Sequence, residues 1–186
     1  MRKLFGLAVL LFLLSSCSTT YLPYSYNYPL RNDAFLSRDS IFTGLVPEGW
    51  FYSLEDSLAP ASLAWVVKDD FTAAFSVREL FLDQLAQKRV REEGLELLAN
   101  ISMVSQVEDP SRIDPENKPR VFKMREREYC GYEVTEKNIR KRVVVFSAVG
   151  KYYECTAAPV KTTLPPEELT KMFTAQQAFL QSLRFE

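Results

Sequence analysis

Histidine is absent from this chain of 186 residues. Catalysis by Ser-His-Asp or Cys-His arrangements, histidine general bases and histidine metal ligands are therefore all excluded. Glycine is scarce, with only 6 residues, and none of them forms a phosphate loop, a dinucleotide fingerprint or a Gly-x-Ser-x-Gly elbow. We therefore expect no catalytic residue, no cofactor and no metal, and the sequence does not predict an enzyme.

An excess of charge of either sign is also missing, since Lys and Arg total 23 against 24 Asp and Glu. Proteins that bind nucleic acid concentrate positive charge against the phosphate backbone. The balance therefore argues against a nucleic-acid partner. The composition, 47% hydrophobic and 25% charged, is typical of a globular protein, and the length suits one domain.

A long hydrophobic run occurs only near the start of the chain. Arg2 and Lys3 form a cationic beginning, and the mainly apolar stretch 4–14 is shorter than the roughly 20 residues of a membrane span. This pattern predicts an export signal that is removed from the mature protein.

The signal ends in Leu14-Ser15-Ser16-Cys17, which resembles the lipobox of bacterial lipoproteins. The resemblance implies that residues 1–16 are cleaved, that Cys17 receives a diacylglycerol thioether, and that the new amino terminus is acylated, for example with palmitate. Several acyl chains together attach a protein stably to a membrane. No aspartate follows Cys17, so by analogy with enteric bacteria we expect the outer membrane, facing the periplasm. An ordinary secretory signal with a chance cysteine is the alternative.

The segment 17–37 is expected to hold the lipidated cysteine and a tether, because prolines and polar residues disfavour both a helix and a central strand. It is rich in tyrosine: Tyr21, Tyr24, Tyr26 and Tyr28. Such rings suit a bilayer interface or a partner protein. Packing across their own domain is an equal alternative.

The remainder, 38–186, is expected to form one domain. Alternating or β-branched runs predict strands at 40–45, 62–68, 72–80, 121–127, 129–135, 140–149 and 152–158. Apolar residues at steps of three and four predict a helix over 81–104, which Gly94 bends or breaks. A closing helix follows, and the set predicts an α+β fold with an antiparallel sheet packed by two main helices.

Turns and caps define the connections between these elements. Pro47 to Gly49 predicts a turn and a hairpin-like opening, and Gly150-Lys151 suits a type II′ hairpin. The last three strands form a meander, in which Val143 to Phe146 is apolar on both faces and is expected in the middle of the sheet. Thr163 is the expected N-cap of the closing helix, with Pro165 and Pro166 in its first turn.

Cys130 and Cys155 remain after lipidation. An oxidising compartment favours a disulfide between them. The meander, however, places them on the two strands that flank 140–149, about 10 Å apart. A disulfide needs a Cα separation below about 7 Å, so we predict two reduced, buried thiols.

Two short motifs give the domain a family resemblance. Residues 42–50 contain a strand followed by Pro-x-Gly-Trp, and residues 179–185 read as the end of a helix and a short strand. Both resemble the PsbP-like and Mog-like domains, and the order of elements between them also fits. The resemblance implies an α/β/α-like sandwich with an antiparallel sheet. That family includes a photosystem extrinsic subunit, a Ran-binding protein and many bacterial proteins of unknown role, without shared catalytic residues, so it implies a binding or accessory module.

Candidate partner-binding residues are aromatic or basic. Trp50 can stack on a partner or a sugar, although aromatic runs of this kind are usually core. Basic residues cluster at a predicted hairpin tip and on one face of the predicted strand 121–127: Lys137, Arg140, Lys141 and Arg142 at the tip, and Lys123, Arg125 and Arg127 on the strand. They suit anionic lipid head groups or an acidic partner, or they only keep the surface solvated, because several glutamates lie close in sequence.

The sequence therefore predicts a lipid-anchored binding or accessory module of the bacterial cell envelope, with the membrane and an envelope protein as partners. A hydrolase that cleaves an envelope glycan through two carboxylates is one alternative, and it needs a cleft with two facing carboxyl groups. The neighbouring pairs Asp69-Asp70, Glu92-Glu93 and Glu167-Glu168 are instead typical of a turn, a solvated surface and a first helical turn. An assembly factor for an envelope complex is the other alternative, and it needs a large exposed apolar patch.

Overall fold

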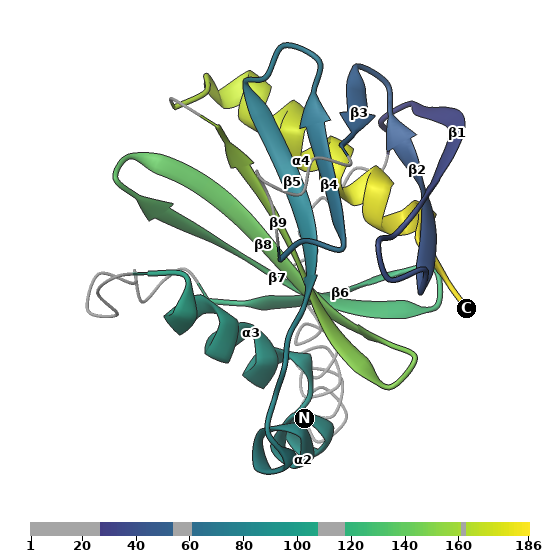
Figure 1. Ribbon diagram of the computed structural model, residues 1–186. Helices are drawn as coiled ribbons and strands as arrows, with labels where there is room; N and C mark the ends of the chain where they lie inside the picture. Colours follow the sequence, from purple (N-terminus) through teal and green to yellow (C-terminus); the bar gives the residue numbers. More distant parts are fainter. Residues whose placement is uncertain (1–26, 54–60, 108–117, 161–162) are drawn as a thin grey trace, which may run out of the picture.

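The computed structural model describes residues 27–53, 61–107, 118–160 and 163–186 (Figure 1). Its strands form a small sheet of order β1-β2-β10 and a seven-stranded sheet of order β3-β4-β5-β9-β8-β7-β6. The strands are β1 Leu30–Leu36, β2 Phe42–Pro47, β3 Trp50–Tyr52, β4 Ala64–Lys68, β5 Ala73–Glu79, β6 Arg120–Met124, β7 Arg127–Glu136, β8 Ile139–Ala148, β9 Lys151–Pro159 and β10 Arg184–Phe185. The helices are α2 Gln84–Glu93, α3 Leu95–Ser105 and α4 Pro166–Ser182.

The seven-stranded sheet carries an apolar layer on each face, because side chains alternate between faces along a strand. Within β8, Val144 and Phe146 belong to the core cluster beneath α4 and the small sheet. Val143 and Val145 belong to the second cluster, beneath α3. The helices accordingly lie on opposite sides of the sheet in Figure 1. The expected place of Val143 to Phe146 inside the sheet is confirmed, and so is the α+β class.

The predicted meander is confirmed, since β7, β8 and β9 pair consecutively and antiparallel. The turn types need one correction. Val149 and Gly150 are the two central residues of the β8–β9 hairpin and have φ of 45° and 75°. Positive φ at both positions defines a type I′ turn, and not the type II′ turn expected from Gly150-Lys151. The β7–β8 hairpin is of the same kind, with Lys137 and Asn138 at φ of 51° and 65°.

The expected first helix is two helices, so the sheet is packed by three. Gly94 separates α2 from α3 with a φ of 86°, a backbone conformation that favours glycine. Asp83 caps α2, because its Oδ1 accepts a hydrogen bond of 2.7 Å from the Ala86 amide. The closing helix α4 starts at Pro166 with Pro165 in the cap position, and no side chain caps it. Thr163 is therefore not its N-cap.

The start of the domain also differs from expectation. Strand β1 pairs with β2, so the folded part begins inside the segment that we expected to be a tether. Strands β2 and β3 lie in different sheets, and the turn at Gly49 therefore joins two layers instead of forming a hairpin. Strand 121–127 is shorter than expected, because Arg125, with a φ of 54°, lies in the turn that leads into β7.

Helix α4 packs its apolar stripe on the sheet, as predicted. Phe179 lies against Phe35 and Phe75, with ring centroids 5.6 Å and 4.9 Å apart. Leu180 and Met172 are buried in the same cluster. In the described ranges, no helix combines the length and the apolar character that crossing a membrane would require. Residues 1–26, which include Cys17, Tyr21, Tyr24 and Tyr26, lie outside those ranges.

Candidate functional site

A hollow of about 650 Å³ opens where the β6–β7 turn meets the C-terminal end of α4 and strand β10. The residues on which the argument depends are Arg125, Arg127, Tyr129, Gln181, Arg184 and Phe185. We call this site the arginine hollow. It combines two distant parts of the chain, since β10 is held next to the sheet by its pairing with β2.

Arg127 is held flat against aromatic rings at this site. Its guanidinium carbon lies 4.6 Å from the centroid of the Phe185 ring and 6.0 Å from that of Phe146. One of its nitrogens, Nη1, donates to the hydroxyl oxygen of Tyr129 over 3.4 Å. Stacking on rings orders a guanidinium and leaves N–H groups available at its edge. The arrangement therefore presents a positioned planar cation.

Tyr129 forms part of the buried wall behind Arg127. Its side chain is 2% exposed, and its hydroxyl donates to the Leu180 carbonyl over 3.3 Å. Burial raises the pKa of this phenol, with the nearby Arg127 acting in the opposite direction. Tyr129 is therefore neutral and contributes a hydrogen-bonded wall without charge.

The charge of the arginine hollow is positive. Its lining holds three arginines against one carboxylate, Glu126. None of the three forms an ion pair with a residue in the ranges that the structure describes. Arginines without an acid partner leave a positive potential in a concave site, and such a potential attracts anionic groups.

The predicted basic cluster at the β7–β8 hairpin exists, but the protein pairs it internally. Glu133 accepts hydrogen bonds from Arg140 Nε over 2.6 Å and from Arg142 Nη2 over 2.6 Å. Lys141 pairs with Glu136 over 3.0 Å. These acids, nearby in sequence, reduce the charge available to a partner. A partner-binding role for the cluster, including the exposed Lys137, stays a prediction.

Trp50 does not lie on a binding surface. It is 1% exposed, and its ring packs on Phe75 with centroids 4.7 Å apart. Its Nε1 donates to the Tyr28 hydroxyl over 3.3 Å, and that hydroxyl donates to the Glu48 carbonyl over 3.1 Å. The expected stacking role of Trp50 is thus corrected to a core role. Tyr28 lies across its own domain, as one of the two alternatives had it.

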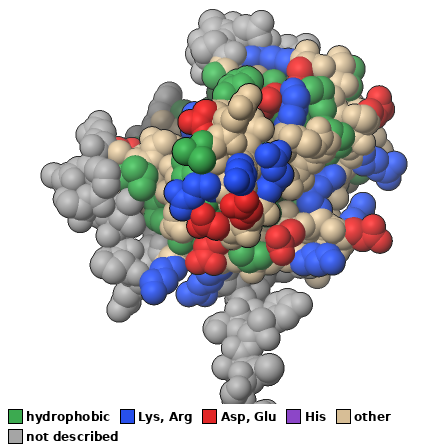
Figure 2. All heavy atoms as spheres, turned by 90° about the horizontal axis from the view of Figure 1, so that it is seen from below, with side chains coloured by type: hydrophobic (Ala, Val, Ile, Leu, Met, Phe, Trp, Pro, Cys, Tyr) green, Lys and Arg blue, Asp and Glu red, His purple; other side chains and the backbone are tan. Residues whose placement is uncertain are grey.

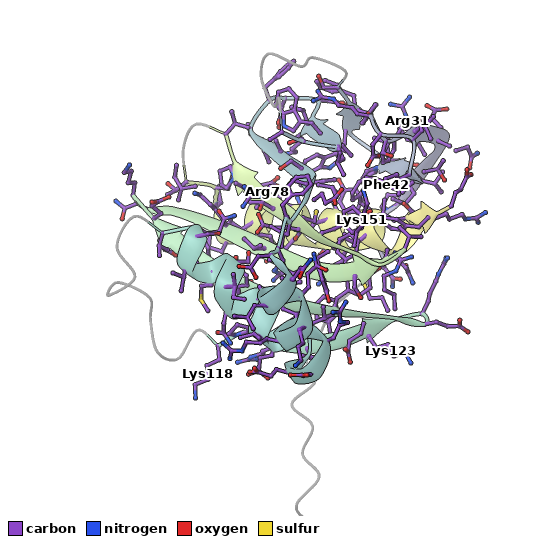
Figure 3. All side chains as sticks on the ribbon, turned by 60° about the horizontal axis from the view of Figure 1, so that its bottom comes forward. Arg31, Phe42, Arg78, Lys118, Lys123 and Lys151 are labelled. Carbon is purple, nitrogen blue, oxygen red and sulfur yellow. The ribbon has the colours of Figure 1, made fainter. Side chains whose placement is uncertain are left out.

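A buried polar network beneath α3 was not found from the sequence. Glu154 on β9 is 1% exposed, and its carboxylate accepts from Arg78 Nε over 2.9 Å, from Gln106 Nε2 over 2.7 Å and from Ser102 Oγ (Figure 3 labels Arg78). Ser102 also lies 2.6 Å from the Tyr132 hydroxyl. The only sequence signal is a glutamate at an inward position of a strand. Its carboxylate is fully occupied by protein donors, so the network is structural.

The carboxylates do not form a hydrolytic site in the hollows of the described surface. The arginine hollow has one carboxylate, Glu126, and the hollow beside α4 at the β7–β8 hairpin has one, Glu133. A glycosidase needs two such groups facing each other. Among the residues that the structure describes, no group of three or more Cys, Asp or Glu is placed to hold a metal ion.

The surface charge is finely mixed elsewhere. On the face seen in Figure 2, Lys and Arg side chains lie between Asp and Glu side chains. Surface pairs such as Arg89 with Glu93, 2.9 Å apart along α2, illustrate this mixture. The arginine hollow therefore differs from these pairs in holding cations without an acid partner.

Comparisons with known proteins place the fold. The chain is similar to the solution structure of cyanobacterial PsbP (CyanoP) from Synechocystis sp. PCC 6803, with a TM-score of 0.52 and 14% identity over 93% of this chain and 99% of that one. A crystal structure from Bacteroides thetaiotaomicron VPI-5482 has a TM-score of 0.47 and 14% identity over 82% of this chain, which spans only 48% of that one. No protein-family model and no curated protein sequence matches the chain. The opening and closing motifs thus implied the right architecture, and the chain has a PsbP-like α+β fold.

Proposed function

We propose that the chain is a lipid-anchored binding module of the bacterial cell envelope that holds an acidic segment of an envelope protein in the arginine hollow. The observation that carries this proposal is the set of three arginines without an acid partner around a hollow of about 650 Å³. The proposal places the protein at the outer membrane, facing the periplasm.

The chemistry of the hollow favours binding over catalysis. A guanidinium offers several N–H groups in a plane and pairs with carboxylates in a two-pronged geometry. Arg127 is already ordered by Phe185 and Phe146, so less side-chain entropy is lost when an anion binds. The single carboxylate, Glu126, lies exposed in a turn and lacks the second acid that hydrolysis of a glycan requires.

The anchor and the fold support the same proposal. The lipobox at Leu14 to Cys17 attaches the amino terminus to a bilayer, which brings the domain close to envelope proteins. The PsbP-like fold carries no catalytic residues that can be transferred to this chain. A module that is tethered and binds gains effective concentration from the tether.

Site-specific crosslinking in intact envelopes tests the proposal. A photo-crosslinking residue replaces Gln181, which lines the arginine hollow without contributing its charge. We expect it to capture one envelope protein, and Arg125→Glu in the same chain to lower the yield at least fivefold. The matched control places the crosslinker at Gln84, an exposed glutamine on α2. Equal capture from both positions, or a yield unchanged by Arg125→Glu, contradicts the proposal.

A further inference from the structure

A second hollow, of about 260 Å³, lies between α4 and the β7–β8 hairpin. We call it the α4 cavity. Its walls differ in character: Arg140, Arg142 and Glu133 come from the hairpin, while Leu169, Phe173 and Gln177 come from α4. One side of α4 lines both hollows, with Gln177 and Gln181 one turn apart.

Gln177 is an unusual residue for a cavity wall. It is only 2% exposed, and its Nε2 group has no hydrogen-bond partner among the described residues. A buried amide that loses its hydrogen bonds to water costs about 1–3 kcal/mol, and most buried polar groups in proteins are satisfied. An unsatisfied donor in the wall of a cavity indicates an acceptor that binds there.

The charge of the α4 cavity indicates what kind of acceptor fits. Two guanidinium groups share the carboxylate of Glu133, so the hairpin wall keeps one net positive charge. The Arg142 guanidinium carbon lies 4.0 Å from the centroid of the Phe173 ring, which fixes this cation against the helix. A negatively charged acceptor therefore matches the site better than a neutral carbonyl.

The rest of the lining limits the size and polarity of the ligand. Leu169 and Phe173 present apolar surface next to the charged wall. A volume of 260 Å³ holds several groups of water size, at about 30 Å³ each, and no large molecule. The site thus suits an anionic head on a short apolar body.

We propose that the α4 cavity binds a carboxylate that carries a short apolar group. Gln177 Nε2 donates to the carboxylate, Arg140 at the hairpin supplies the positive charge, and Leu169 and Phe173 contact the apolar group. The carboxylate comes either from a free small acid or from the C-terminal residue of a polypeptide. The proposal uses neither the lipid anchor nor the arginine hollow, so it stands or fails independently of the proposed function.

Calorimetric titration of the lipidated protein in a non-ionic detergent tests the proposal with three probes. Isovalerate represents a free acid, N-acetylvaline represents a polypeptide C-terminus, and N-acetylvalinamide lacks the carboxylate. We expect at least one of the two acids to bind with a dissociation constant of ~1 mM or tighter, and the amide to bind at least tenfold more weakly. Preference for isovalerate indicates a free acid, and preference for N-acetylvaline indicates a polypeptide end. Absence of binding by both acids, or equal binding by the amide, overturns the proposal.

Variants separate a ligand-binding role of Gln177 from a structural one. Gln177→Leu is expected to weaken binding of the acid at least tenfold and to leave the urea midpoint equal or higher, because it removes an unsatisfied buried donor. Gln181→Leu, on the same side of α4 but in the other hollow, is the matched control and leaves the affinity unchanged. Undiminished affinity in Gln177→Leu overturns the proposal.

A second variant keeps the test decisive if Gln177→Leu folds poorly. Arg140 has a side chain that is 57% exposed, so Arg140→Gln is expected to fold normally. The proposal requires this variant to bind the acid at least fivefold more weakly. An affinity equal to that of the parent protein contradicts it.

Discussion

At the scale of single residues, burial controls the chemistry of the two thiols. Cys130 pairs with Val145 and Cys155 with Val144, so they lie on the strands either side of β8 and on opposite faces of the sheet. No disulfide can span that geometry. Burial raises the pKa of each thiol to about 12, so neither forms the reactive thiolate near neutral pH.

We therefore predict that both thiols resist alkylation until the protein unfolds. Iodoacetamide at pH 8 should leave the folded protein unmodified at Cys130 and Cys155. The same reagent in denaturant should add one alkyl group to each, as measured by mass spectrometry without reductant. A mass lighter by two hydrogens, with no alkylation in denaturant, would mean that β7 and β9 are neighbours and that the sheet order is wrong.

At the scale of elements, α4 is held by its buried aromatic side chains. Phe173 is 5% exposed, and replacing a buried phenylalanine by alanine costs about 3–5 kcal/mol. We expect Phe173→Ala to lower the free energy of unfolding by that amount in urea denaturation. Lys171→Ala is the control, because Lys171 is exposed and pairs only with Glu168 one turn earlier. Small effects from both variants would show that α4 does not pack on the sheet.

Helix α3 depends on a polar contact and not only on apolar packing. Removing the charge from Glu154 weakens its bonds to Arg78, Gln106 and Ser102, and hydrogen bonds to charged groups contribute about 1.5–3 kcal/mol. We expect Glu154→Gln to destabilise the protein by about that amount and to speed amide hydrogen exchange in α3. Glu93→Gln, on the exposed face of α2, should change neither. Exchange that accelerates equally in α4 would mean that the network is not specific to α3.

Local patterns predicted the elements better than their pairings. The alternation in β8 and the apolar stripe of α4 are local, so the sequence alone predicted the interior strand and the packed helix. The two-residue strand β10 forms only because β2 is next to it, and no local pattern encodes that contact. Its pairing brings Arg184 to the β6–β7 turn, so the arginine hollow was not predicted as a site. Gln177 was missed for the same reason, since a buried glutamine reads as polar surface in a sequence.

At the scale of the whole molecule, groups kept protonated by burial make the fold sensitive to alkaline pH. The thiols of Cys130 and Cys155 titrate near 9 when exposed and near 12 when folded, and burial also raises the pKa of Tyr132. Above pH 9 the unfolded chain has lost these protons while the folded chain keeps them, so stability falls as pH rises from about 9 toward 12.

Each such group contributes a slope of up to about 1.4 kcal/mol per pH unit. We expect the urea midpoint to drop between pH 8 and pH 10.5, and the drop to be smaller in the double variant Cys130→Ala, Cys155→Ala. Comparison of the slopes cancels the loss of packing that the substitutions cause at every pH. Equal slopes in the two proteins would mean that the thiols are not protected by burial.

The position of the whole molecule in the cell depends on one sulfur atom. Only a thiol can form the thioether with diacylglycerol, so Cys17→Ser is expected to abolish acylation and to move the protein from the membrane fraction to the soluble fraction. Labelled palmitate and fractionation of the producing bacterium measure both effects. Ser18→Ala is the matched control, because it leaves the Leu14 to Cys17 motif intact and should stay labelled and membrane-bound. Label that persists on Cys17→Ser would exclude the lipoprotein assignment, and an unlabelled parent protein in the soluble fraction would support the alternative of an ordinary secretory signal.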